Sequence, residues 1–232
     1  MGINHEHRDL VVIVPTRGRP HNALALKEAF YDTEANSDLV FVVDFDDPMI
    51  EEYQNLPIDI LTYEREGKGM AAPLNKAARE LLACCQGGYK YFAFMGDDHR
   101  PRTMKWDSEI IKHLADLHPS GIVYGNDLLQ GANLPTAVFM TRNIVEVLDG
   151  MVPPTMKHLY LDDFWLHLGH SIKSIRYLEN VIIEHLHPIA GKAAMDAGYA
   201  EVNASDISSH DHQAFNDYIR SEPYYDAIYR LS

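Results

Sequence analysis

Short apolar runs alternate with helical patterns along residues 1–100 of this chain. The runs have the length and the β-branched or aromatic content of buried strands. Between them, the clearest helical pattern repeats apolar side chains at spacings of three and four from Ala71 to Cys85, which gives one apolar face. This alternation predicts an α/β fold with a mostly parallel central sheet flanked by helices. The expected strands are 10–14, 39–43, 58–63 and 89–95.

The second half of the chain has a less regular pattern. Thr103 is a candidate N-cap for a helix that reaches about residue 117. From residue 209 onward, charged residues alternate with tyrosine and phenylalanine, as expected of a peripheral helix. The remaining elements that the pattern predicts are strands at 121–124, 136–140 and 174–184 and a helix that begins at Tyr160.

Composition supports one domain over residues 1–232, because 46% apolar residues can bury a sizeable core. We expect its segments to be 1–100, 101–208 and a helical tail at 209–232. No apolar stretch approaches the roughly 18 residues that span a bilayer, and the first ten residues lack the apolar segment of a signal peptide. We therefore expect a cytoplasmic protein without a membrane span. The net charge of −14 disfavours tight nonspecific binding to nucleic acid.

The strongest candidate for chemistry is the sequence YKYFAFMGDDHRP at residues 89–101. Its apolar run ends at Gly96, and Asp97, Asp98 and His99 follow at the carboxyl end of the expected strand, where α/β folds bind ligands. Two adjacent buried carboxylates need a compensating cation, and oxygen ligands suit Mg²⁺ or Mn²⁺. The alternative is a solvated Gly-Asp-Asp turn, which is common in proteins.

Charged residues also follow the first three expected strands. Arg17 and Arg19 come after the first strand and can bind phosphate, while Asp44 ends the second and can accept from a base imide or a ribose hydroxyl. Arg65 and Lys68 flank glycines before a helix, a favourable position for an anion. Each of these sites has a plain alternative, namely a surface turn with ordinary ion pairs.

A second acidic pair, Asp162 and Asp163, precedes the aromatic face of the helix that begins near Tyr160. We assign Asp162 the role of N-cap and Asp163 that of a general base that takes a proton from a hydroxyl. His185 and His187 lie on one face at the end of the 174–184 strand, because strand side chains repeat every two residues. One of them, with His185 preferred, is a candidate metal ligand; the alternative is a structural histidine.

In their order along the chain, these motifs resemble a family 2 type glycosyltransferase with a GT-A fold, a Rossmann-like sheet. The resemblance covers about residues 10–188. The matching segments are PTRGRP, VVD, GKGMAAPLN, GDDH, DDFW and EHLHP. Longer segments, FMGDDHRPRT, YGNDLLQGANLPT and EHLHPIAGKA, are similar to small glycosyltransferases of actinobacteria and their phages. Two departures are that GDDH is not a strict Asp-X-Asp and that the second acidic motif reads Asp-Asp instead of Glu-Asp.

The resemblance implies a metal-dependent, inverting transfer of a sugar from a nucleoside diphosphate sugar, with a UDP-sugar expected, to an acceptor hydroxyl. Residues 1–100 would then be the nucleotide-sugar half and 101–208 the acceptor and catalytic half. Asp163, with Asp162 as its partner, would be the catalytic base. Mn²⁺ or Mg²⁺ would be held by Asp97 or Asp98 with His185 or His187. The implied donor-binding residues are Pro15, Thr16, Arg17, Arg19, Asp44, Arg65, Lys68, Asn75, Asp97 and Lys192.

Two alternatives to this function stay open at the level of sequence. A nucleotidyltransferase also places carboxylates and a metal at strand ends, although PTRGRP supplies only part of a triphosphate loop. A nucleotide-sugar-binding module without catalysis is the other. The acceptor is equally open among a glycan, a small metabolite, a protein and a modified DNA base, and the sequence does not indicate an oligomeric state.

Overall fold

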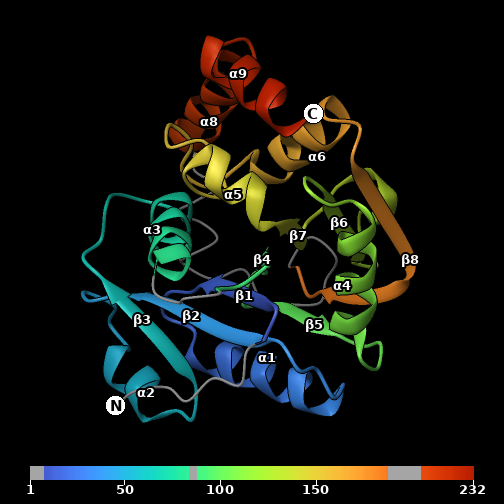
Figure 1. Cartoon of the computed structure of the whole chain (residues 1–232). Coiled ribbons are helices and arrows are strands. Elements are labelled where there is room, and N and C mark those ends of the chain that lie inside the picture. The colour runs from blue at the N-terminus through green and yellow to red at the C-terminus, as the bar shows by residue number, and fades with distance from the viewer. Residues whose placement is uncertain (1–7, 84–87, 188–204) are drawn as a thin grey trace.

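One eight-stranded sheet runs through the computed structural model, which describes residues 8–83, 88–187 and 205–232 (Figure 1). The strand order is β3-β2-β1-β4-β7-β6-β8-β5. All seven strands expected from the sequence are present, and the short β5 is added. The strands are β1 (Leu10–Pro15), β2 (Asp38–Asp44), β3 (Asp59–Tyr63), β4 (Tyr91–Phe94), β5 (His99–Pro101), β6 (Ile122–Asn126), β7 (Val138–Thr141) and β8 (Ile175–His185).

The sheet is parallel over the first half of the chain and mixed over the second. β3, β2, β1 and β4 are parallel neighbours, so their carboxyl ends meet at one edge. β6 and β8 are also parallel, whereas β7 is antiparallel to both β4 and β6. The predicted α/β fold with a mostly parallel sheet in a single domain is confirmed. Its polar strand ends come together, as expected at the ligand-binding edge of such a sheet.

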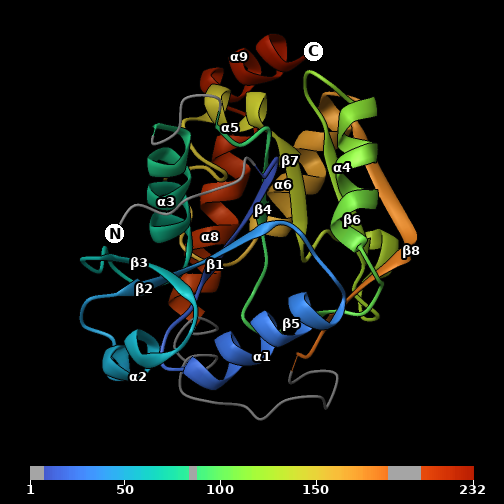
Figure 2. The same ribbon diagram turned by 60° about the horizontal axis from the view of Figure 1, so that its bottom comes forward.

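Helices cover both faces of the sheet, and the side chains of β1 are accordingly buried alternately in two cores. Val11 and Ile13 pack in the core on the side of α3, α5, α6 and α9, whereas Val12 and Val14 pack on the side of α1, α2 and α4. Figure 1 shows α3 and α1 on opposite sides of β1 and β2, and Figure 2 shows α4 beside β6 and β8. Among the described helices, none has the length and apolar character needed to cross a bilayer. The helices are α1 (Pro20–Asp32), α2 (Ile50–Asn55), α3 (Ala71–Ala83), α4 (Trp106–Asp116), α5 (Arg142–Leu148), α6 (Leu161–Ser171), α8 (Ser205–Tyr218) and α9 (Glu222–Leu231).

One local prediction is wrong, and a second is incomplete. Thr103 does not cap α4, which begins at Trp106 after Lys105; the Thr103 hydroxyl instead accepts from the backbone N–H of Ile182 in β8, at 2.9 Å. The tail is helical, as expected, but it forms two helices instead of one, and Tyr224, Ala227 and Leu231 of α9 are buried.

Candidate active site

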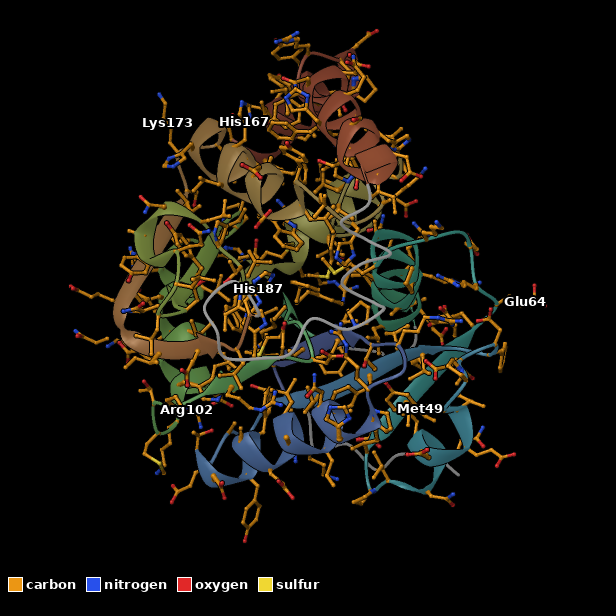
Figure 3. The ribbon with its side chains drawn as sticks, turned by 180° about the vertical axis from the view of Figure 1, so that it is seen from behind. Met49, Glu64, Arg102, His167, Lys173 and His187 are labelled. Carbon is orange, nitrogen blue, oxygen red and sulfur yellow. The ribbon has the colours of Figure 1, made fainter. Side chains whose placement is uncertain are left out.

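A cleft of about 590 Å³ lies at the carboxyl ends of β1, β2 and β4 and extends to the beginning of α6. Figure 3 labels two of its lining residues, Met49 beside α2 and His187 near the middle of the molecule. Lys68, Asn75 and Asp163 do not line it, and Lys192 lies outside the described residues. The candidate residues that line the cleft are Pro15, Thr16, Arg17, Arg19, Asp44, Arg65, Asp97, Asp98, Asp162, His185 and His187.

Three side chains in the cleft form a compact group of metal-binding type. One ligand atom each of Asp98, His99 and His185 lies within 4.8 Å of the others. The strand β5 produces this arrangement, because its register with β8 places His99 directly opposite His185. The two imidazole rings stack with centroids 4.3 Å apart, and His187 packs edge-on against His185 at 5.0 Å. Sequence analysis identified Asp98 and His185 but could not show that a short antiparallel strand joins them.

The donor set of this group fits a divalent cation. Both imidazoles have a nitrogen 3.4 Å from a carboxylate oxygen of Asp98, and the buried Nδ1 of His185 has no hydrogen-bond partner among the described residues. Burial alone would raise the pKa of Asp98, but the two imidazoles hold it well below its usual range. Gly96 makes room for the group, because a Cβ there would lie 2.5 Å from the Asp98 carboxylate. A carboxylate together with two imidazoles is a ligand set that suits Mn²⁺ and related ions.

Asp97 accepts hydrogen bonds from the loop that follows β1 and from the start of α1. Its carboxylate accepts from the Thr16 hydroxyl at 2.6 Å, from Asn22 Nδ2 at 3.2 Å and from Arg19 at 3.4 Å. Burial, followed by the charge of Asp98, raises the pKa of Asp97. Asp97 lines the cleft but lies outside the three-residue group of metal-binding type, and its contact with a donor stays a prediction.

The loops after β1 and β2 are held together by ion pairs and backbone bonds. Arg17 donates to Asp44 at 3.1 Å and to Asp46 at 2.7 Å, and Arg65 lies 3.8 Å from the same Asp44 oxygen. The buried Asp47 accepts from the backbone N–H groups of Gly18 and Met49. This part of the cleft presents one carboxylate between two guanidinium groups.

Two residues of the GKGMAAPLN segment lie away from the cleft. Lys68 is exposed. Asn75 is buried, and its amide group accepts from the backbone N–H groups of Met151 and Val152 and donates to the Val152 carbonyl. Its hydrogen bonds therefore join α3 to the segment before α6. Neither residue lines the cleft, so their contact with the donor stays a prediction.

The two acidic residues of DDFW face different cavities. Asp162 lines the cleft, whereas Asp163 lines a separate hollow of about 450 Å³ with His167 and Phe215. Asp162 is not the N-cap of α6, because the cap position is Tyr160; it lies in the first turn, where its carboxylate accepts from the backbone N–H of Asp163 at 3.1 Å. Burial, and then the charge of Asp163, raises the pKa of Asp162 to about 6. A carboxylate with this pKa can act as a base near neutral pH.

Sequence analysis missed Asp211, which is fully buried and organises the segment that leads into α6. Its carboxylate accepts from the backbone N–H groups of Lys157, His158 and Leu159 at 2.8–3.0 Å. Burial alone would raise the pKa of Asp211, but the His210 side chain and these N–H groups hold it below its usual range. The tail of the chain therefore shapes the wall of the cleft. The only signal in the sequence is an aspartate on an otherwise ordinary helix.

We predict that Asp211→Asn lowers the free energy of unfolding by about 2–3 kcal/mol, because hydrogen bonds to a buried charge are lost and N–H groups lose their acceptor. Chemical denaturation at pH 7 measures this. Because the folded-state pKa of Asp211 is depressed, its contribution is present above the unfolded-state pKa and is lost as pH falls through the folded-state pKa. The difference between the two proteins should therefore shrink in acid. Asp217→Asn, on the exposed side of α8, is the control, and an equal loss in both variants would contradict the prediction.

No protein-family model matches the sequence, and no curated protein matches it by sequence. Solved structures match it in fold. Glucosyl-3-phosphoglycerate synthase from Mycobacterium tuberculosis, in complex with Mn²⁺, UDP-glucose and phosphoglyceric acid, superimposes with a TM-score of 0.59 at 9% identity, over 90% of this chain and 80% of that one. The same synthase with Mg²⁺ and UDP gives a TM-score of 0.57 at 11% identity, over 90% and 80%.

A variant of Drosophila β1,4-galactosyltransferase 7, in complex with manganese, UDP-Gal and xylobiose, gives a TM-score of 0.50 at 13% identity. The match covers 84% of this chain and 79% of that one. At identities this low, structural similarity establishes the architecture alone, and the chemistry has to be argued from the site. The chain has the GT-A fold that the sequence predicted.

Proposed function

We propose that this protein is a metal-dependent glycosyltransferase that uses a nucleoside diphosphate sugar, with a UDP-sugar as the expected donor. The observation that carries the proposal is the cleft itself. It combines the group of Asp98, His99 and His185 with guanidinium groups at one end and the carboxylate of Asp162 at the other. Structures of the same fold that bind Mn²⁺ or Mg²⁺ together with UDP support this reading.

Asp98 and His185 are the residues that would hold the cation, with His99 and His187 beside them. A divalent cation there supplies positive charge next to a diphosphate leaving group. Asp44 accepts from the base, and Arg17, Arg19 and Arg65 are the cationic side chains of the cleft that can bind phosphate oxygens. Lys192 stays a prediction for the same task.

Asp162 is the base that we favour, because its carboxylate faces the cleft and Asp163 faces elsewhere. It would take the proton of an acceptor hydroxyl as that oxygen attacks the anomeric carbon, while the bond from that carbon to the diphosphate breaks. Attack from the face opposite the diphosphate gives inversion. This stereochemistry is part of the proposal and is read from the configuration of the product.

We infer the same division of the chain as from the sequence. Residues 1–100 carry the donor-binding loops, 101–208 carry the catalytic carboxylate, and 209–232 support them through α8 and α9. The acceptor, which includes a modified DNA base among its candidates, and a cytoplasmic location remain predictions, as does the likeness to proteins of actinobacteria and their phages.

Isothermal calorimetry with UDP and GDP, in Mn²⁺ and then in EDTA, tests the proposal. We expect micromolar binding of UDP in Mn²⁺ and a loss of at least about tenfold in affinity in EDTA. UDP release from a UDP-sugar then distinguishes an enzyme from a binding module. Absence of binding to either nucleotide would remove the glycosyltransferase proposal and favour a nucleotidyltransferase, and binding without turnover would favour the inactive module.

A further inference from the structure

His158 is a side chain of the cleft that the proposed function does not yet use. It lies in the segment between α5 and α6 and lines the cleft together with Asp98 and Asp162. Its Nδ1 is buried and has no hydrogen-bond partner among residues 8–83, 88–187 and 205–232. A buried polar atom without a partner is costly, and on a residue that lines a binding cleft a bound ligand can supply the missing bond.

The backbone around His158 is fixed from two sides. Asp211 accepts from three successive N–H groups at 157–159, and the carbonyl of Lys157 accepts from the N–H of Ala71 at 2.9 Å. Gly69 allows this approach, because a Cβ there would lie 2.3 Å from the Lys157 carbonyl oxygen. The segment is thus attached both to the start of α3 and to α8. A side chain carried on so constrained a backbone is suited to recognising a ligand in one geometry.

The electrostatics of the position favour an uncharged partner. Burial lowers the pKa of His158 to about 4. The charge of Asp211 opposes this shift, as does that of Asp98, whereas the charge of Arg19 adds to it. A neutral imidazole carries one N–H donor and one nitrogen acceptor, which matches a hydroxyl group, itself both donor and acceptor. A phosphate dianion would instead favour a cationic donor, and guanidinium groups already line the cleft.

We propose that His158 recognises a hydroxyl group of the donor sugar. This inference rests on the proposed function and deepens it. A diphosphate held near Asp98 would put its sugar next to that carboxylate. The polar side chains that the start of α6 and the segment before it contribute to the cleft are His158, Tyr160 and Asp162, and of these His158 has the buried nitrogen without a partner among the described residues. His158 is a specificity-determining residue that acts on the sugar and leaves the nucleotide to the loops after β1 and β2.

Calorimetry in Mn²⁺ with UDP, UDP-glucose, UDP-galactose and UDP-N-acetylglucosamine tests this inference on the full chain. His158→Phe keeps a ring of similar size without nitrogen. This substitution should lower the affinity for the UDP-sugar that binds wild type most tightly by about tenfold. It should change the affinity for UDP by less than about twofold. His158→Asn places an amide nitrogen or oxygen near the position of Nδ1 and should recover most of the affinity. Thermal unfolding without ligand verifies that both variants are folded.

The outcomes separate this inference from the proposed function. Equal weakening of UDP and UDP-sugar, or an Asn variant no better than the Phe variant, would overturn the recognition of a hydroxyl and leave the glycosyltransferase proposal in place. The inference would also be overturned if His158→Phe bound the UDP-sugar as tightly as wild type does. It would be overturned too if the wild-type protein bound UDP but none of the three UDP-sugars. Wild-type protein that binds neither UDP nor any UDP-sugar would overturn both.

Discussion

Asp98→Asn should abolish metal-dependent binding of UDP, with a loss in affinity of at least about a hundredfold in Mn²⁺. Asp98 is the carboxylate of the candidate metal group, and both imidazoles lie 3.4 Å from its oxygens. Removing a partner of a metal ligand typically costs about 10–100-fold, so removing the charged ligand itself should cost at least as much. The remaining weak binding should no longer respond to EDTA. Calorimetry with UDP in Mn²⁺ and in EDTA measures both effects.

The control for this substitution is Asp149→Asn. The Asp149 side chain is 84% exposed and lies outside the cleft, and asparagine tolerates the left-handed backbone at that position. It should bind UDP as wild type does. Asp98 lies close to two histidines in the folded protein, so thermal unfolding without metal is needed to compare the stability of the variant with that of wild type. Metal-dependent UDP binding that survives in a folded Asp98→Asn protein would place the cation elsewhere.

The architecture was readable from the sequence because buried parallel strands leave continuous apolar runs. Because Asp44, Asp98 and His185 follow the ends of expected strands, their positions at one edge of the sheet could also be predicted. β5 was not readable, since three residues carry no periodicity, yet it is the element that puts His99 opposite His185. Asp211 was missed for a different reason: its partners are backbone N–H groups about 50 residues earlier, and a backbone donor leaves no trace in the sequence.

The sequence could not decide between Asp162 and Asp163 as the carboxylate that faces the cleft. Successive residues on a helix point about 100° apart, so the first residue of α6 decides which carboxylate faces the cleft. A sequence pattern locates a helix start only to within a few residues. The assignment of Asp162 as N-cap was therefore wrong although the helix itself was right, because the chain enters α6 through a left-handed Tyr160.

Asp162→Asn should lower the rate of UDP release from a UDP-sugar by about 10²–10⁴-fold and leave UDP affinity nearly unchanged, because a general base acts on the acceptor and not on the nucleotide. Water serves as acceptor in this assay until the natural one is known. Asp163→Asn is the matched control, since it removes the same charge one residue further along, where the side chain lines the other hollow. A loss of rate in Asp163→Asn alone would reverse our assignment.

The dependence of the rate on pH should distinguish these two variants. Burial and the charge of Asp163 raise the pKa of Asp162 to about 6. Because a base must be deprotonated to act, the wild-type rate should decrease as the pH falls below about 6. Asp163→Asn removes that negative charge, lowers the pKa of Asp162 and should move the acidic limb of the profile to lower pH. Asp162→Asn should remove the limb altogether. Because the variants differ by one position in the same turn of α6, a shift in one and a disappearance in the other would identify the carboxylate that takes the proton.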